Sequence, residues 1–300
     1  MDIFGIFAGI AAASIWGGMY VVSKVVLDII PPYTLLSMRL ILGVICLLFI
    51  MILQRRWTLS RRQIIQTLVV GFIGFGISLG FQFTGTKLST AANAALVTSA
   101  SPVFILLFGI WILGERVSVT RSLALLLASI GVVAVLDPRT VLLGSDGSLG
   151  NLILIGAAIT WGLYSVLMKV LTQTSSTIEV SMYAFLGGLP LSIFAAGFER
   201  DIIRWSAIDG TVILGILYLG IISTAIAMYL WNSALARLEA GIVSLLFFAQ
   251  PIVGVTLGSI FLGEPLNIGF WIGAVLISTG LLLAAREQRM YSRVKALQDL

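Results

Sequence analysis

Long runs without a charged residue alternate with short polar breaks along the whole chain. A helix needs roughly 20 apolar residues to cross the hydrocarbon of a bilayer. Ten stretches have about that length and hold at most one charge each: 3–23, 32–54, 63–86, 88–114, 117–136, 147–168, 180–198, 210–236, 240–263 and 265–285. The pattern predicts an all-α integral membrane protein with ten transmembrane helices. The first stretch lacks a basic segment before it, so we interpret it as the first helix and not as a secretory signal.

Composition supports this interpretation and excludes several functions. Only 31 of the 300 residues are charged, and 59% are apolar, whereas a soluble chain has roughly 25% and 45–50%. The chain has no His and one Cys, Cys46. It therefore lacks the ligands of a His/Cys metal site, the base of a Ser-His-Asp or Cys-His centre and a partner for a disulfide. We expect no enzyme activity and no cofactor.

The positions of Lys and Arg predict an orientation. With ten helices, both termini face the same side, and the loops and tail on that side hold twelve basic residues against five on the other. By the positive-inside rule, both termini are cytoplasmic, in what we expect to be a bacterial cell inner membrane. The same rule explains the net charge of +5, so nucleic acid is not an expected partner.

Two motifs occur in both halves of the chain and in the same order. The first is a Trp-Gly pair followed by a lysine, at Trp16-Gly17 with Lys24 and at Trp161-Gly162 with Lys169. The second is a proline followed twelve residues later by Gly-Glu, at Pro102 with Gly114-Glu115 and at Pro251 with Gly263-Glu264. We expect a first repeat over 3–136 (helices 1–5), a connecting loop over 137–148, a second repeat over 149–285 (helices 6–10) and a basic cytoplasmic tail over 286–300. Because five is odd, the repeats are inverted, as in many secondary transporters.

These motifs also carry a family resemblance. The chain resembles the EamA-type, ten-helix branch of the drug/metabolite transporter superfamily from about residue 6 to 285, and within it the YddG-like aromatic amino-acid exporters. The matching segments are Trp16-Gly17, Ala91-Ala92-Asn93-Ala94-Ala95, Leu113-Gly114-Glu115, Tyr229-Leu230-Trp231-Asn232 and Leu262-Gly263-Glu264. The resemblance implies export of metabolites such as amino acids.

Pro102 and Pro251 lie close to the middle of their predicted helices. A proline there removes a backbone hydrogen bond, and the freed carbonyl must find a partner or line a polar cavity. Ser101 and Gln250 directly precede the two prolines. We expect a kink at a central cavity that also acts as a hinge. The alternative is a packed kink whose carbonyls are satisfied by neighbouring Ser and Thr.

Trp16 and Trp161 lie deep in their helices, unlike the tryptophans of an interfacial belt. Tyr20 follows Trp16 by four residues, and Tyr164 follows Trp161 by three, which places each pair on one helix face. These aromatic faces predict the wall of a substrate site, although aromatic residues that only fill space between helices would give the same pattern.

A set of uncharged polar residues completes the predicted substrate site. These groups could bind the ammonium and carboxylate of a zwitterion, or could serve as hydrogen bonds between helices. The set is Ser78, Gln82, Asn93, Ser99, Ser101, Tyr229, Asn232 and Gln250.

Few charges fall within the predicted helices. Lys24 and Lys169 near helix ends are interpreted as snorkelling to the interface. Arg39 could bind an anionic group or a neighbour's helix end, and both readings stay open. Glu115 and Glu264 are interpreted as structural. No acidic residue lies within any of the ten stretches, so we expect transport that is not coupled through a buried carboxylate.

The predicted function is a secondary transporter that exports small metabolites, above all amino acids, by alternating access through an uncharged central cavity. An alternative within the superfamily is a nucleotide-sugar, sugar-phosphate, drug or other metabolite carrier, although phosphate substrates call for basic residues at depth. A non-transport alternative is a membrane assembly or lipid-handling protein. The expected partners are a small-molecule substrate and the lipid bilayer, and a monomer is compatible with the sequence.

Overall fold

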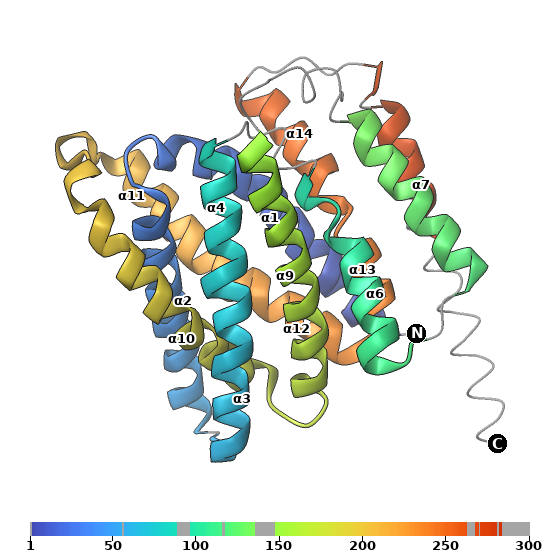
Figure 1. Cartoon of the computed structure of the whole chain (residues 1–300), viewed down its shortest axis with the longest axis horizontal. Coiled ribbons are helices and arrows are strands. Elements are labelled where there is room, and N and C mark those ends of the chain that lie inside the picture. Colours follow the sequence, from blue (N-terminus) through green and yellow to red (C-terminus); the bar gives the residue numbers. More distant parts are fainter. Residues whose placement is uncertain are drawn as a thin grey trace.

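Helices form every regular element in the described part of the chain. The computed structural model describes residues 2–55, 57–88, 97–115, 118–135, 148–262, 268–269, 271–280 and 282–283 (Figure 1). Its α-helices are α1 (Ile3–Leu27), α2 (Pro32–Gln54), α3 (Arg61–Gly71), α4 (Leu79–Leu88), α6 (Ser101–Leu113), α7 (Val119–Val135), α9 (Ser148–Thr172), α10 (Thr177–Ala196), α11 (Gly210–Leu217), α12 (Ala227–Arg237), α13 (Ala240–Leu246) and α14 (Ala249–Leu262). Two π-helices, η1 (Phe72–Ser78) and η4 (Tyr218–Ile226), and two 3-10 turns, η2 (Gly197–Ile202) and η3 (Trp205–Ala207), complete the list.

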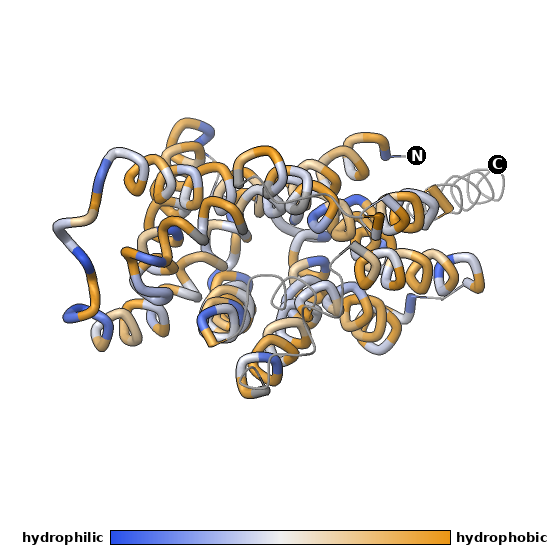
Figure 2. Tube along the Cα trace, turned by 90° about the horizontal axis from the view of Figure 1, so that it is seen from above, coloured by the Kyte–Doolittle hydropathy of each residue, from blue (hydrophilic) through white to orange (hydrophobic). Residues whose placement is uncertain are grey.

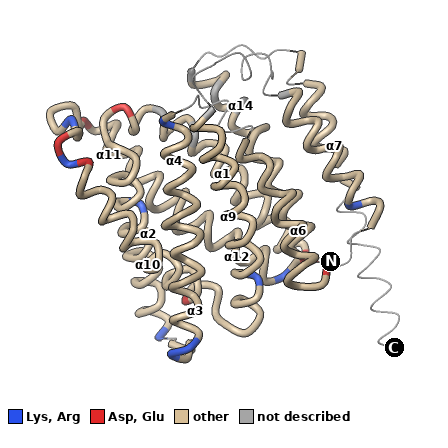
Figure 3. Tube along the Cα trace, in the orientation of Figure 1, with Lys and Arg blue, Asp and Glu red and all other residues tan. Residues whose placement is uncertain are grey.

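Most of the long helical stretches have the length that a bilayer requires. Seven continuous helical stretches are long and apolar enough to span, and three shorter apolar helices lie at Ser101–Leu113, Val119–Ala134 and Trp271–Gly280. Apolar residues cover most of each helix, and hydrophilic ones gather at the ends and loops (Figure 2). Lys, Arg, Asp and Glu are likewise concentrated at the two ends of the bundle (Figure 3). The prediction of an all-α membrane protein is confirmed.

The helix starts follow local signals in the sequence. Ser60 and Gln63 form a capping box at the start of α3, and the Asp209 carboxylate accepts the Val212 N–H at the start of α11. At α2, Pro32 is the first residue, and the Glu199 carboxylate from the following repeat accepts the N–H of Thr34 at 2.7 Å. Each cap satisfies backbone donors that have no partner within the helix.

The two halves run in opposite directions through the bundle. Asp2, at the start of α1, pairs with Arg237 at the end of α12 at 3.1 Å. Lys169, near the end of α9, donates to the Leu235 carbonyl of the same helix α12 at 3.2 Å. The start of α1 and the end of α9 therefore lie at one end of the bundle, which we call the N-terminal end. Helices α1 and α9, which carry the two Trp-Gly pairs, are therefore antiparallel, as the predicted inverted repeats require.

The two repeats are interlocked. α1 packs mainly against α12 and α14 of the second half, whereas α9 packs against α4 and α6 of the first. Glycine permits both approaches. A Cβ at Gly17 would lie 2.6 Å from the Gln250 carbonyl oxygen, and a Cβ at Gly162 would lie 2.6 Å from the Phe104 Cβ. The glycine of each Trp-Gly pair thus lets the first helix of one repeat contact a later helix of the other.

Equivalent helices of the two repeats also carry the π-helical segments. η1 separates α3 from α4, and η4 separates α11 from α12. A π-helical segment inserts an extra residue into the turn and shifts the hydrogen bonding of the carbonyls around it, and such segments are frequent at functional sites. In η4, the Thr224 hydroxyl donates to the Leu219 carbonyl, five residues earlier, at 2.7 Å. η1 contributes Ser78 to the lining of the cavity described next, and η4 contacts two of its lining residues, Trp16 and Arg39.

Candidate functional site

A cavity with about 450 Å³ of space, including its mouth, lies where the two repeats meet. Helices α1, α2, α4 and α6 of the first half and α9, α12 and α14 of the second contribute to it. Its lining residues are Trp16, Met19, Arg39, Ser78, Leu79, Gln82, Thr98, Ser101, Ala157, Trp161, Met228, Phe247 and Gln250. Six of the predicted substrate-binding residues are among them: Trp16, Ser78, Gln82, Ser101, Trp161 and Gln250.

Aromatic rings form one wall of this cavity. The ring centroids of Trp16 and Trp161, from equivalent positions in the two repeats, lie 5.7 Å apart, edge to face. Trp231 and Phe247 contact Trp16 at 5.3 Å and 6.0 Å. The Trp16 indole donates to the Ser223 carbonyl of η4 at 3.0 Å, whereas the buried Trp161 indole N–H has no partner in the described part of the chain. The sequence interpretation included Trp16 and Trp161 and missed Phe247, which also lines the cavity.

The polar side of the cavity comes from hydroxyls and amides. The Ser78 hydroxyl donates to the Ala157 carbonyl at 2.8 Å, and the Ser101 hydroxyl donates to the Thr98 carbonyl at 2.7 Å. Both serines therefore direct their proton to backbone and leave only acceptor lone pairs for a ligand. Gln82 and Gln250 add amide side chains to the lining.

Breaks in two helices border the cavity near the prolines. α13 ends at Leu246, a turn follows at 247–248, and α14 begins at Ala249, so that Pro251 lies in its first turn. Pro102 is the second residue of α6, after a turn at 99–100. Where kinks were expected, the helices are therefore completely interrupted. Each proline lies in the first turn of the helix that follows, where it gives up no helical hydrogen bond. The Ser101 hydroxyl satisfies the freed Thr98 carbonyl, as expected for the alternative of a packed kink. The role of the two prolines as a hinge stays a prediction.

Arg39 is the charged residue of this lining. It lies seven residues into α2, or about 10 Å from the start of that helix, and is 1% exposed. Its Nε donates to the Thr224 hydroxyl at 3.1 Å and its Nη2 to the Ser223 hydroxyl at 3.4 Å. The guanidinium carbon lies 5.4 Å from the centre of the Phe83 ring. Nη1 has no partner, and no ion pair of Arg39 is found in the described part of the chain.

The sequence analysis left the role of Arg39 undecided. Counting residues from Pro32, the first position of α2, would have revealed its depth. Met19, Thr98 and Met228 also line the cavity without having been singled out. Their residue types are common in helix packing, so composition offered no signal for them.

The remaining predicted residues lie away from the lining or outside the description. Tyr164 is buried between the rings of Trp161 and Phe75, at 5.0 Å and 5.1 Å. The Asn232 amide donates to the Ser181 hydroxyl at 2.9 Å, which is the interhelical role considered as the alternative. Tyr229 and Ser99 are partly buried and do not line the cavity. The side chain of Tyr20 and all of Asn93 lie outside the described residues.

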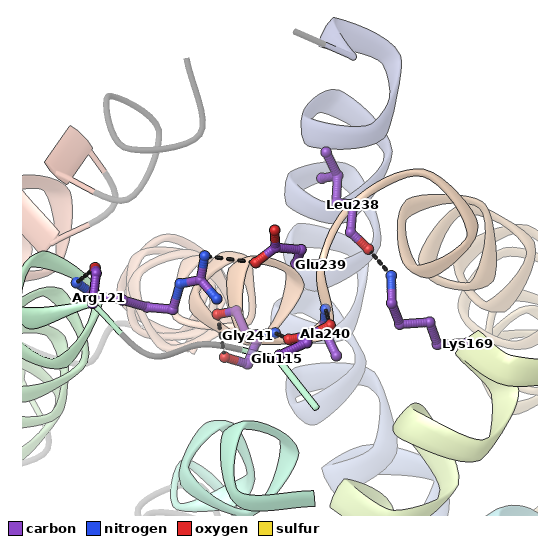
Figure 4. A network of polar contacts seen from close by, with 9 residues as sticks. Glu115, Arg121, Lys169, Leu238, Glu239, Ala240 and Gly241 are labelled. Atoms are coloured by element: carbon purple, nitrogen blue, oxygen red, sulfur yellow. Dashed lines mark hydrogen bonds and ion pairs between the residues drawn. The ribbon is translucent and has the colours of Figure 1, made fainter. Parts of the chain in front are cut away.

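A charged network lies at the N-terminal end of the bundle (Figure 4). The Glu115 carboxylate accepts the N–H groups of Ala240 and Gly241 at 2.7 Å and 3.0 Å and so caps α13. Arg121 forms an ion pair with Glu239 at 2.7 Å. The structural interpretation of Glu115 agrees with this cap. Glu264, its repeat equivalent, lies outside the described residues.

Lys169 joins the same network. Its amine donates to the carbonyls of Leu235 and Leu238, the last of which follows α12. A cation at a helix C-terminus interacts favourably with the unpaired carbonyls there. The Lys169 amine thus has helix-end carbonyls as its partners, and the interpretation that it snorkels to the interface stays a prediction. The side chain of Lys24, its equivalent, is not described.

Comparisons with known proteins agree with this architecture. The model of the EamA-like transporter family matches residues 3–136 and 148–286. The chain is 26% identical to the uncharacterized transporter YetK of Bacillus subtilis, over 98% of this chain and 91% of that protein. It is 28% identical to a probable amino-acid metabolite efflux pump of Salmonella typhimurium, over 92% and 93% of the two chains. A solved crystal structure that is 20% identical has a TM-score of 0.79 over 94% of this chain and 98% of that one, which shows the shared fold.

Proposed function

The chain belongs to the EamA-like transporter family, and on this premise we propose that it exports amino acids or closely related metabolites by alternating access. The cavity between the repeats is the observation that carries the proposal. Inverted repeats exchange conformations around a site at their interface, which then opens to one side of the membrane at a time. Trp16 and Trp161, one from each repeat, form a single wall of this cavity.

The lining supports a small substrate with an apolar or aromatic side chain. Trp16, Trp161 and Phe247 offer ring surface, and Gln82 and Gln250 offer donors and acceptors. The names of two relatives, both probable amino-acid metabolite efflux pumps, favour the same class. A sugar phosphate would bring at least two negative charges, whereas Arg39 is the only cation among the described lining residues.

The distribution of charge supports an orientation in the membrane. The N-terminal end of the bundle holds Arg121, Lys169 and Arg237, and the positive-inside rule would place it in the cytoplasm of a bacterial cell. Export then runs from this end to the other across the inner membrane. No Asp or Glu is among the described lining residues, which favours a facilitator or exchanger over a proton-coupled pump.

Purified protein in proteoliposomes tests this function. We expect counterflow of a labelled amino acid in a screen that includes phenylalanine, and loss of flux in Trp16→Ala, Trp161→Ala and Gln250→Ala. Trp111→Ala is the matched control, because Trp111 is 75% exposed on α6 and should leave flux unchanged.

Four outcomes would contradict parts of the proposal. Absence of flux for every amino acid would refute the substrate class, and accumulation of sugar phosphates would favour the alternative carrier. Normal flux in all three cavity variants would refute the site. Uphill transport driven by an imposed pH gradient would refute the uncoupled mechanism.

A further inference from the structure

The position of Arg39 in the cavity suggests what the substrate must carry. We propose that Arg39 is the binding site for a single carboxylate of the transported molecule, an inference that rests on the proposed transport function and narrows its substrate class. Four observations support it: the burial of the cation, the hydrogen bonds that position it, its unused donors and the charge balance of the lining.

The first observation is burial without a counter-ion. Arg39 is 1% exposed and lies about 10 Å into its helix. A buried charge is strongly destabilising unless a group of opposite charge or a metal compensates it. Ionisable residues at such depth in membrane proteins usually serve function. In the described part of the chain, hydroxyls and the Phe83 ring surround Arg39 and no carboxylate pairs with it.

The second observation is the way the second repeat positions the guanidinium. Thr224 belongs to η4, and its hydroxyl proton goes to the Leu219 carbonyl at 2.7 Å. Its lone pairs are then left to accept the Nε–H of Arg39 at 3.1 Å. The Ser223 hydroxyl is the acceptor for Nη2. The π-helical segment thus supplies two acceptors side by side and fixes the orientation of a cation that belongs to the first repeat.

The third observation is the donor capacity that remains. A guanidinium has five N–H groups in a planar fork, and the two on Nη1 have no partner although this atom is buried. A carboxylate is the ligand that fits such a fork, and hydrogen bonds between charged partners are the strong ones. Because Arg39 lines the cavity, a substrate can reach it there.

The fourth observation is the net charge of the lining. With Arg39 as the only charge among the described lining residues, one bound carboxylate gives a neutral site. A phosphate dianion would leave an excess negative charge in a medium of low dielectric. The substrate ammonium would meet only uncharged acceptors, such as the amide oxygens of Gln82 and Gln250. Recognition should therefore depend more on the carboxylate than on the ammonium.

A set of phenylalanine analogues tests this ranking. Binding to the purified protein is followed by fluorescence of the cavity tryptophans, and flux is followed separately by counterflow in proteoliposomes. We expect phenylalanine and 3-phenylpropionate, which share the carboxylate, to bind. Phenethylamine and phenylalanine methyl ester, which lack it, should bind at least about tenfold more weakly, the loss expected for a charged hydrogen bond.

Substitutions assign the effect to Arg39. Arg39→Gln should weaken phenylalanine binding at least about tenfold and abolish the preference for phenylalanine over its ester. Arg39→Lys should restore part of the binding and of this preference, because lysine has the positive charge but lacks the planar set of donors of a guanidinium. Thr224→Val keeps the cation and removes one acceptor that positions it, so we expect an intermediate loss of phenylalanine binding. This variant tests the proposal even if Arg39→Gln does not fold. Trp111→Ala should bind all four analogues as the parent does.

The results separate this proposal from the proposed function. Equal binding of phenylalanine and its ester, or unchanged preference in both Arg39→Gln and Thr224→Val, would overturn the carboxylate site even if flux persists. Carboxylate-selective binding without flux would support the site and refute the transport function. Absence of binding for every carboxylate would overturn both.

Discussion

Two buried arginines of this protein have opposite surroundings. Arg121 is 4% exposed and forms an ion pair with Glu239 at the N-terminal end of the bundle. Arg39 is 1% exposed and has hydroxyls, a ring and a cavity around it. A charge that serves structure is expected to have its partner within the protein. The comparison suggests that Arg121 serves the fold and that Arg39 is kept for a partner from outside.

The surroundings of the two arginines extend this contrast. Around Arg121, the carboxylate of Glu115 caps α13 and Lys169 caps the end of α12, so that each of these charges meets a charge or a helix end (Figure 4). Glu115 and Lys169 are thereby tied to the segment between α12 and α13. The cavity instead combines neutral groups with a single cation. In the network around Arg121, these charges have their partners within the protein. In the cavity, the substrate supplies the partner of Arg39.

Removal of Arg121 should have the largest effect on stability. In Arg121→Met, Glu239 loses its partner, and breaking a buried pair destabilises by about 3–5 kcal/mol. Glu239 is 28% exposed, so we expect a loss of about 3 kcal/mol, at the lower end of that range. An SDS unfolding titration of the detergent-solubilised protein measures it. Adding Glu239→Gln should recover part of the loss, and an unchanged titration midpoint would show that the pair contributes nothing.

Glu115→Gln should have the next largest effect. The glutamine keeps one acceptor for the α13 cap and loses the charge that interacts with two backbone N–H groups. Helix caps and charges at helix N-termini contribute about 1 kcal/mol each. We therefore expect a loss of about 1–2 kcal/mol in the same titration. A loss as small as that of an exposed control, such as Arg62→Gln, would contradict the capping role.

Arg39→Met provides the sharpest test of the comparison. The substitution removes a buried cation and leaves no carboxylate unpaired in the described part of the chain, so stability should change by less than about 1 kcal/mol or increase. Flux should nevertheless be lost. Melting temperature and counterflow measured on one preparation check both. A destabilisation as large as that of Arg121→Met would mean that Arg39 is a structural residue.

The smallest effect is expected at the exposed pair of Asp2 and Arg237. The Gly5 N–H hydrogen bond, and then Arg237, hold the pKa of Asp2 below its ordinary value of 3.8. A lowered carboxyl pKa adds stability above that ordinary value, and the gain is lost as the pH falls through the lowered one. Asp2→Asn should cost about 0.5 kcal/mol at pH 7 and almost nothing at pH 3. Melting curves of Asp2→Asn and the parent protein at both pH values test this. An equal difference in stability between the two proteins at pH 7 and at pH 3 would contradict it.

The membrane architecture could be predicted from the sequence because charge is excluded from hydrocarbon. Stretches without charge marked the helices, and the two Trp-Gly pairs marked the repeats. The π-helical segments could not be predicted in the same way. Phe72–Ser78 and Tyr218–Ile226 are as apolar as an ordinary helix. In η4, one partner of the shifted backbone comes from elsewhere in the chain, because the Trp16 indole donates to the Ser223 carbonyl.

The candidate site was partly predictable for a related reason. Polar residues within apolar runs stand out, so Ser78, Gln82 and Gln250 were found. Phe247 did not stand out, because a ring in a cavity wall and a ring in a helix contact have the same sequence pattern. Asn232 illustrates the opposite error, since it is polar and buried but bonds to Ser181 of α10. Only the packing of helices from both repeats separates these cases.

The interlocked packing of α1 also has a consequence for biosynthesis. Its main partners, α12 and α14, end about 210 and 235 residues further along the chain. At a translation rate of roughly 5–20 residues per second, α1 waits roughly 10–50 seconds in the membrane before these contacts can form. During that time lipid must be its solvent, which explains why residues 3–23 carry no charge although α1 ends up among the most enclosed helices. A helix that is made early in translation is thus among the last to complete its contacts.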